Sequence, residues 1–333
     1  MKITEYYKNK KVLVTGGAGC VGSHLSEKLD EIGAKVVVLD NFSRPEDNPR
    51  NKNEVLESHP KIKFIKGDIL DFKLVKKLVA DSDFIFHLAA LPSHRLALLD
   101  PKSYAAVDII GTINVLEAIR QIGKPKKMLF TSTNKVYGKQ KPPFKESYVP
   151  MPEGPYGQAK IDAEEWCSLY HKFYDLSVVV TRLFHVIGPR SQPDRELSIF
   201  VEQILKDQPQ IVHGKTIKGQ FNSCSAGYTN IYEVVDGLLL ALMKNKGFDV
   251  FNLGSSVETA VKDIARMAQK LLKKSLKIIQ KEMMSHESLH QASNPEKSMK
   301  LLGWQTKVPV QKSIEQYINW RLKNGPRKFA VYK

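Results

Sequence analysis

The chain has few cysteines, no long apolar run and no block of like charge. Its three cysteines, Cys20, Cys167 and Cys224, lie far apart and follow neither a metal-binding nor a disulfide spacing. No run approaches the roughly 18 apolar residues of a membrane helix. The N-terminal stretch MKITEYYKNKKVLV has no apolar segment long enough for a signal peptide. We therefore expect a cytoplasmic protein with reduced cysteines and no membrane partner.

Acidic residues are outnumbered, with 35 Asp and Glu against 51 Lys and Arg, which gives a formal net charge of +16. Such an excess could attract nucleic acid, an anionic membrane or an anionic small substrate. The positive residues are scattered, and no zinc-finger or RNA-recognition signature accompanies them. We therefore expect a generally basic, solvated surface and no nucleic-acid partner.

Short apolar runs alternate with amphipathic segments through the first half of the chain. The pattern predicts strands at 11–16, 35–40, 61–68, 83–90, 126–133 and 177–183, and helices at 22–33, 71–80, 101–122 and 156–175. Continuous apolar strands that alternate with helices are typical of parallel strands covered on both faces. The predicted fold class is therefore α/β, with a Rossmann-type, doubly wound parallel sheet.

The alternation becomes less regular after Gly188. Here we expect helices at 195–207, 230–246 and 258–273, and short strands at 210–213, 249–253 and 276–280. The predicted organisation is a Rossmann domain over 1–188 and a smaller C-terminal α/β substrate domain over 189–333. The pieces near 230–253 are candidates to return to the first domain.

A glycine-rich turn follows the first predicted strand. In GGAGCVG (16–22), Gly17, Gly19 and Gly22 have the spacing G-x-G-x-x-G and open a helix. Backbone without Cβ atoms can approach a pyrophosphate there, and the helix N-terminus offers free N–H groups. The second strand ends in Asp40, whose carboxylate can accept hydrogen bonds from a ribose and would repel a 2′-phosphate. The order predicts an NAD site, although Arg44 leaves NADP open.

A second constellation joins two segments, TSTNKVYG (131–138) and PYGQAK (155–160). Tyr156 and Lys160 are four residues apart at the start of a helix, so both project from one face. An ammonium near a phenol lowers the phenol's pKa toward a value useful in a general base. The strand that ends in Thr133 reaches the sheet edge where doubly wound folds bind ligands. A hydroxyl there could bind the substrate hydroxyl that Tyr156 deprotonates.

These segments, together with VLDNFS (38–43), GDI (67–69), FHLAA (86–90), LFHVIGPR (183–190) and LLGW (301–304), resemble the extended short-chain dehydrogenases/reductases. More closely, the chain is similar to the NAD-dependent nucleotide-sugar epimerase/dehydratase family and looks UDP-glucose 4-epimerase-like. The resemblance covers nearly the whole chain. It also implies a homodimer that packs through the helices near 101–122 and 156–175.

The resemblance implies roles for individual residues. The cofactor contacts it implies are Gly16, Gly19, Cys20, Val21 and Gly22 at the pyrophosphate, Asp40 and Asn41 at the adenosine ribose, Asp68 and Ile69 at the adenine, and Leu88, Ala89 and Ala90 beneath the cofactor. Thr133 takes the family's Ser/Thr role. Tyr156 is the base, and Lys160 binds the nicotinamide ribose and tunes Tyr156.

The chain departs from the family next to Thr133. Family dehydratases carry Asp-Glu at the positions of Asn134 and Lys135 and use that pair as acid and base for the loss of water. Without carboxylates, dehydration lacks its usual base, whereas epimerisation needs only hydride removal, rotation of the keto sugar and hydride return. The string TNKVYG is similar to nucleotide-sugar 2-epimerases, while the downstream segments look more like 4-epimerases.

The substrate half departs as well. His185 stands where the family often has an Asn, Asp108 replaces another Asn, and two arginines that usually bind a diphosphate are missing. Their replacements are expected among Arg182, Arg190, Arg195, Lys215 and Lys218, unless the substrate is not a standard nucleoside-diphosphate sugar. The candidate substrate residues are Asn134, His185 and Arg190.

We predict an NAD-dependent nucleotide-sugar epimerase that acts at C4 through transient oxidation. The alternatives are a nucleotide-sugar 4,6-dehydratase, a net dehydrogenase/reductase on a modified sugar nucleotide, and a non-catalytic NAD-binding scaffold or sensor. The pattern predicts no metal.

Overall fold

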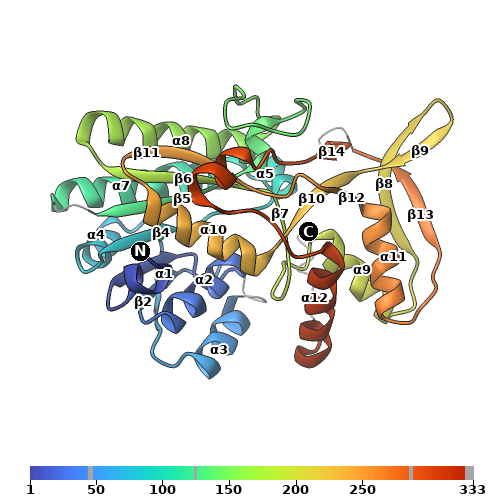
Figure 1. The fold of residues 1–333 in the computed structure, drawn as a ribbon, viewed down its shortest axis with the longest axis horizontal. Helices are drawn as coiled ribbons and strands as arrows, with labels where there is room; N and C mark the ends of the chain where they lie inside the picture. The colour runs from blue at the N-terminus through green and yellow to red at the C-terminus, as the bar shows by residue number, and fades with distance from the viewer. Residues whose placement is uncertain (44–47, 124–125, 285–287, 327–333) are drawn as a thin grey trace.

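The computed structural model describes residues 1–43, 48–123, 126–284 and 288–326. Its centre is a seven-stranded parallel sheet in the order β11-β6-β5-β4-β1-β2-β3 (Figure 1). The strands are β1 (Lys11–Thr15), β2 (Lys35–Asp40), β3 (Lys63–Lys66), β4 (Phe84–His87), β5 (Lys127–Thr133), β6 (Ser177–Leu183) and β11 (Phe248–Leu253). The predicted Rossmann-type α/β class is confirmed.

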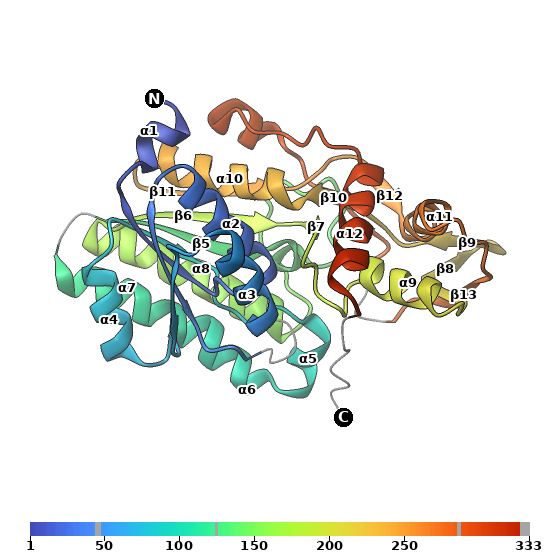
Figure 2. The ribbon, with the colours of Figure 1, turned by 90° about the horizontal axis from the view of Figure 1, so that it is seen from below.

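Helices cover both faces of this sheet, as Figure 2 shows. On one face lie α1 (Ile3–Tyr7), α2 (Cys20–Glu31) and α10 (Ile231–Lys244), with α3 (Asn48–Ser58) beside α2; on the other lie α4 (Phe72–Ala80), α7 (Gly111–Ile122) and α8 (Pro155–Tyr174). Successive strand residues alternate between the two apolar cores, so Val14 packs with one and Leu13 with the other. This double burial explains why the strands read as unbroken apolar runs.

The seventh strand comes from the second half of the chain. β11 pairs in parallel with β6, from Phe248 opposite Val178 to Leu253 opposite Leu183. The α10 helix, which precedes it, packs on β5 and β6 and against α2. A strand and a helix from 231–253 therefore complete the Rossmann sheet and its cover.

The remaining elements form a smaller unit beside the carboxyl edge of the sheet (Figure 1). One part contains β7 (His185–Ile187), β10 (Ser225–Asn230), β12 (Glu258–Ala260) and β14 (His290–Gln291), and another contains β8 (Gln210–Ile217), β9 (Gln220–Ser223) and β13 (Ile278–Glu282). Helices α9 (Glu196–Leu205), α11 (Val261–Leu271) and α12 (Val310–Asn324) pack there around a separate apolar core. The helix α12 was not predicted from the sequence, and the predicted helix at 258–273 begins with the short strand β12.

The predicted helix at 101–122 is not continuous. It consists of α6 (Pro101–Tyr104), a π-helical turn at Ala105–Ile110 and α7, and a short α5 (His94–Leu99) precedes it. A π-turn inserts one extra residue into a helix and is frequent at functional sites. Here it carries Asp108, whose side chain is fully buried. Within the described residues, no helix is both long and apolar enough to cross a membrane.

Candidate active site

The glycine-rich turn leaves no room for side chains. Gly16 has a φ of +72°, and a Cβ atom on it would come within 2.7 Å of the Ala89 backbone nitrogen. A Cβ on Gly22 would collide with the carbonyl oxygen of Gly16. The N-terminus of α2 follows at Cys20, with Gly19 as its extended N-cap residue. Open backbone facing a helix N-terminus fits a pyrophosphate.

Asp40 lies at the end of β2, where backbone amides orient its carboxylate. Oδ2 accepts a hydrogen bond from the Ala18 amide at 3.0 Å, and Oδ1 accepts one from the Phe42 amide at 2.8 Å. The carboxylate thus lines a cavity in a fixed orientation, at the strand end where dinucleotide-binding folds hold the ribose. The geometry fits NAD. The alternative with Arg44 lies outside the described residues.

Asn41, Gly67 and Ile69 line the same cavity near the end of β2, where the resemblance predicts the adenine. The predicted Asp68 does not line the cavity itself, but its Oδ2 accepts a hydrogen bond from the side-chain nitrogen of Asn41 at 2.9 Å. Leu88, Ala89 and Ala90, which are predicted to pass beneath the cofactor, also line this cavity.

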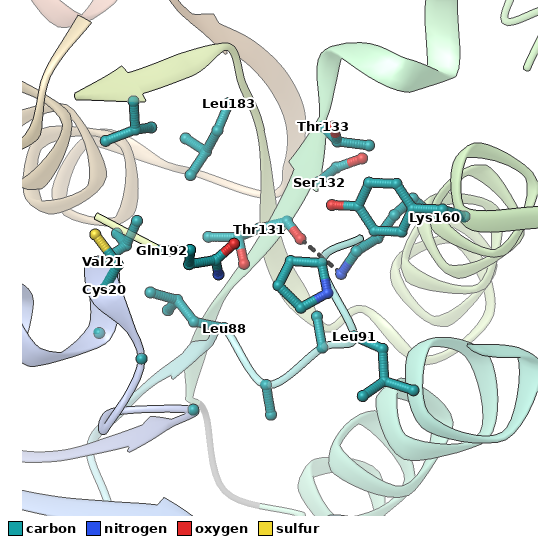
Figure 3. A pocket seen from close by; sticks show the side chains of 18 of the residues that line it. Cys20, Val21, Leu88, Leu91, Thr131, Ser132, Thr133, Lys160, Leu183 and Gln192 are labelled. Atoms are coloured by element: carbon teal, nitrogen blue, oxygen red, sulfur yellow. Dashed lines mark hydrogen bonds between the residues drawn. The ribbon is translucent and has the colours of Figure 1, made fainter. Parts of the chain in front are cut away.

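Thr133, Tyr156 and Lys160 line this one cavity together with the glycine turn. Figure 3 shows Ser132, Thr133 and Lys160 at one side of it and Cys20 and Val21 at the other. Thr133 ends β5, and its Oγ1 accepts the Lys135 amide at 3.3 Å, which starts a 3₁₀ turn. Tyr156 is the second residue of α8, after a proline whose fixed φ suits the first helical position.

The ammonium of Lys160 is buried and held from three directions. Nζ donates to the Thr131 carbonyl oxygen at 3.2 Å, which is the dashed line in Figure 3. It also lies 4.8 Å from the centre of the Phe130 ring, a cation–π distance. Its third neighbour is the Asp108 carboxylate, with Oδ1 at 3.4 Å. The lysine is thus fixed below the sheet edge that carries Thr133.

Asn134 and Lys135 point toward the smaller unit. The Asn134 side-chain nitrogen donates to Oε1 of Gln291 at 2.7 Å, and the Lys135 ammonium lies 3.2 Å from the same oxygen. Gln291 belongs to β14, so this contact joins the segment after β5 to the C-terminal unit. Both residues line the cavity, and Asp40 and Glu196 are the only carboxylates among the described residues that do.

His185, the first residue of β7, also lines the cavity and lies beside Tyr228 and Glu196. Its ring packs edge-on against Tyr228, with centroids 5.6 Å apart, and the Tyr228 hydroxyl donates to Glu196 at 2.9 Å. Burial lowers the pKa of His185 to about 4, although the nearby Glu196 charge opposes this shift. The imidazole is therefore neutral at neutral pH.

Two of the candidate arginines are engaged elsewhere. Arg190 binds Glu27 at 2.6 Å and Glu54 at 3.1 Å, which ties the loop after β7 to the helices of the Rossmann face. The expectation that Arg190 contacts the substrate is therefore not supported by its position, because it does not line the cavity. Arg182 forms a buried pair with Glu164, with Nη2 and Oε2 2.6 Å apart.

Arg195 does line the cavity, and its guanidinium donates to the Pro92 carbonyl oxygen at 3.1 Å. Lys215 and Lys218 belong to the β8–β9 hairpin and do not line it. Sequence reasoning also missed His94, Gln192 and Tyr228, which face the cavity. Arg195, by contrast, was already a candidate from the sequence, as a cation in the loop GPRSQPDR after β7. The described residues contain no group of His, Cys, Asp or Glu that could hold a metal ion.

A nucleotide-binding parallel sheet whose carboxyl edge presents a hydroxyl, a tyrosine and a buried lysine in one cavity is the architecture of a short-chain dehydrogenase/reductase. The sequence model of the family described as GDP-mannose 4,6 dehydratase matches residues 13–317. The chain belongs to that family, within the extended short-chain dehydrogenases/reductases that act on nucleotide sugars with NAD.

Known relatives span nearly the whole chain. The chain is 31% identical to UDP-glucuronate 4-epimerase 4 of Arabidopsis thaliana, over 96% of this chain and 77% of that protein. It is 29% identical to human dTDP-D-glucose 4,6-dehydratase, over 95% of this chain and 91% of that protein. The crystal structure of UDP-glucuronic acid 4-epimerase from Bacillus cereus, in complex with UDP-glucuronic acid and NAD, superposes with a TM-score of 0.85. It is 30% identical and covers 93% of this chain and 98% of its own.

Proposed function

We propose that this protein is a nucleotide-sugar epimerase that inverts the C4 hydroxyl of a hexopyranose ring, with NAD as a tightly held cofactor. Both epimerases and dehydratases are among its relatives, so similarity alone does not separate the two reactions. The observation that carries the proposal is the residue set around Thr133: the hydroxyl, tyrosine and lysine needed for reversible oxidation are present, whereas the neighbouring positions lack carboxylates.

The protein residues handle the proton of the reaction. The Thr133 hydroxyl, at the end of β5, is placed to hydrogen-bond the sugar C4 hydroxyl, and Tyr156 accepts that hydroxyl's proton. Lys160 stabilises the phenolate by its charge, which is strongest where water is excluded. When bound, NAD supplies the hydride acceptor and donor. Tyr156 returns the proton when the sugar is reduced on its other face.

Dehydration would need an additional proton acceptor beside the sugar C5 atom and a donor for the leaving hydroxyl. Family dehydratases carry those two groups as Asp and Glu at the sequence positions of Asn134 and Lys135, which here lack a carboxylate and contact Gln291 instead. The cavity carboxylate Glu196 accepts the Tyr228 hydroxyl and lies beside His185. This arrangement supports epimerisation over loss of water.

Arg195 and His185 are the residues that we expect to bind the diphosphate of the substrate. Arg195 is the exposed guanidinium on the cavity wall, and it offers several N–H donors for phosphate oxygens. His185, being neutral, can donate one hydrogen bond from its ring. Two arginines of the usual family pattern are absent, so we expect Arg195 to carry more of the substrate's affinity than a single arginine does in such a pair.

The test is product analysis from a panel of nucleotide sugars, by mass spectrometry and NMR. An epimerase gives a product of unchanged mass with an inverted C4 hydroxyl, and it requires no added reductant. A product that has lost water would overturn the proposal in favour of the dehydratase. Stoichiometric accumulation of NADH would instead identify a net dehydrogenase.

We also propose a homodimer that packs through α8 and the α6–α7 segment. Apolar side chains are exposed on their outer surface, among them Trp166 at 39%, Leu169 at 40% and Phe173 at 65%. On α8 these lie three and four residues apart, so they share one face. Light scattering after gel filtration should give a dimer for the wild type and a monomer for Phe173→Glu. A wild-type monomer at micromolar concentration would contradict this assignment.

A further inference from the structure

The carboxylate of Asp108 and the ammonium of Lys160 form an ion pair beneath the proposed active site. The Oδ1 and Nζ atoms are 3.4 Å apart, with the side chains 0% and 3% exposed. Apart from the Lys160 ammonium, no side chain among the described residues donates a hydrogen bond to either carboxylate oxygen of Asp108. Burying a carboxylate away from water costs folding free energy. We therefore looked for a function of its charge beside Lys160.

The other groups near this pair contribute little charge. On β4, His87 is neutral, because burial and then the Lys160 charge lower its pKa to about 3. On α8, Glu164 is paired with Arg182, and burial raises the pKa of the Cys167 thiol.

The helical segments on either side of the π-turn also place little charge near this pair. Tyr104 of α6 packs edge-on against the Tyr156 ring, with centroids 6.1 Å apart, and its hydroxyl donates to the Ser93 carbonyl oxygen. Lys102 of the same helix is exposed. On α7, Glu117 is engaged by Arg120 near the surface. Asp108 is therefore the main counter-charge that Lys160 meets inside the protein.

The proton affinity of Tyr156 depends on the net charge of this pair. A lone ammonium would favour the phenolate strongly, whereas an ammonium balanced by a carboxylate favours it less. Burial raises the pKa of Asp108, and the Lys160 charge and the Leu91 backbone amide oppose that rise. The π-turn is what places Asp108 at this position, because a regular helix over 101–122 has one residue fewer per turn.

We propose that Asp108 is a positioning residue that holds the Lys160 ammonium and balances its charge, so that Tyr156 titrates at a higher pH than it would beside an uncompensated lysine. This inference rests on the proposed function in one respect, since it takes Tyr156 as the catalytic base. It adds a residue that touches neither the sugar nor the cofactor and acts through Lys160.

The experiment compares Asp108→Asn with the wild type, using NAD-loaded protein. The phenolate absorbance of Tyr156 is titrated in the near ultraviolet, with Tyr156→Phe in each background to isolate its signal, and the acid limb of kcat/KM is measured in parallel. Asp108→Asn should lower both apparent pKa values by about one unit, a tenfold change in proton affinity. The surface variant Glu165→Gln, on the helix α8 that also carries Tyr156, should shift neither pKa.

An unchanged or raised Tyr156 pKa in Asp108→Asn would overturn the inference. Should that variant not fold, as judged by thermal melting, Asp108→Ser removes the same charge with less volume and decides the question. A failure of the proposed function has a different signature, because the wild type would then form no C4-inverted product at any pH. The spectroscopic titration would still report the charge balance.

Discussion

Glu164 and Arg182 form a two-point buried ion pair beside the C-terminal end of β5. The Arg182 Nε lies 3.0 Å from Oε1 of Glu164, and Nη2 lies 2.6 Å from Oε2. The same carboxylate accepts the Ser132 hydroxyl, and Arg182 also donates to the Tyr137 hydroxyl at 2.9 Å. The pair therefore links β5, β6 and α8 next to the cavity that Thr133 and Tyr156 line.

Removal of one partner should destabilise the fold. Glu164→Gln leaves a buried guanidinium without its counter-charge, and we expect a loss of about 3–5 kcal/mol in the free energy of unfolding. Urea denaturation with NAD present measures this loss. The exposed pair Asp263 and Arg266 provides the control, because Asp263→Asn should leave the urea midpoint unchanged. Equal midpoints for the two variants would show that the buried pair is not structurally important.

Loss of the Tyr156 hydroxyl should stop the chemistry but not binding. Tyr156→Phe is expected to lower kcat about 10²- to 10⁴-fold, the usual contribution of a general base, with little change in the dissociation constant for NAD. Tyr174→Phe, at the exposed far end of the same helix, should retain full activity. Turnover of the true substrate by Tyr156→Phe at the wild-type rate would refute the assignment of the base.

Asp40 should control cofactor affinity and choice. Asp40→Asn weakens the charge-assisted hydrogen bonds to the ribose, each worth about 1.5–3 kcal/mol, and should raise the dissociation constant for NAD about ten- to hundredfold. It should also narrow the gap between NAD and NADP, because it removes the charge that repels the 2′-phosphate. Calorimetric titration of the apoprotein measures both constants. Asp81→Asn, exposed at the end of α4, serves as the control.

The two arginines of the loop after β7 should separate by phenotype. Arg195→Met is expected to raise KM for the nucleotide sugar about tenfold or more while leaving the thermal midpoint in place. Arg190→Met removes the ion pair with Glu27 and one of the two that Glu54 makes, the other being with Arg50, so it should lower the thermal midpoint and leave KM nearly unchanged. If instead Arg190→Met raised KM at unchanged stability, the original expectation of a substrate contact for Arg190 would be reinstated.

Stability should fall in mild acid because of buried neutral histidines. Burial lowers the pKa of both His24 and His87 to about 3, against about 6.5 in the unfolded chain. Between these values the unfolded state binds protons that the folded state excludes, so stability falls as pH drops, by up to about 1.4 kcal/mol per pH unit for each histidine. Above about pH 6.5 these histidines are neutral in both states, so they do not make the free energy of unfolding depend on pH.

This effect can be assigned by urea denaturation at about pH 7 and about pH 5.5. The difference between the two midpoints should shrink in His87→Gln, which keeps hydrogen-bonding capacity but cannot titrate. In His290→Gln, where the side chain is exposed, the difference should match the wild type. A wild-type midpoint that does not change over this range would rule out buried neutral histidines.

The strands, the glycine turn and the Tyr156–Lys160 pair were predictable because each follows from local periodicity or fixed spacing. The partners of Asn134 and Arg190 were not predictable. Asn134 meets Gln291, 157 residues along the chain, and Arg190 meets Glu27, 163 residues before it. Side-chain pairs at such separations depend on how whole elements dock, and they leave no periodic trace in the sequence. The π-turn was equally hidden, because the segment 101–122 retains ordinary helical composition.

The position of β11 has a consequence for how the chain folds. The central sheet is completed on one side by residues 248–253, which pair with β6 from 177–183, so ribosomal synthesis must pass β7, α9, β8, β9 and β10 of the smaller unit before the sheet can be finished. Until then β6 is an uncovered parallel edge, a slow pairing partner and a site for association with other chains. A fragment that ends at Gly188 would expose that edge permanently. Chaperone dependence during synthesis, and not in the finished protein, is the expected mark of this topology.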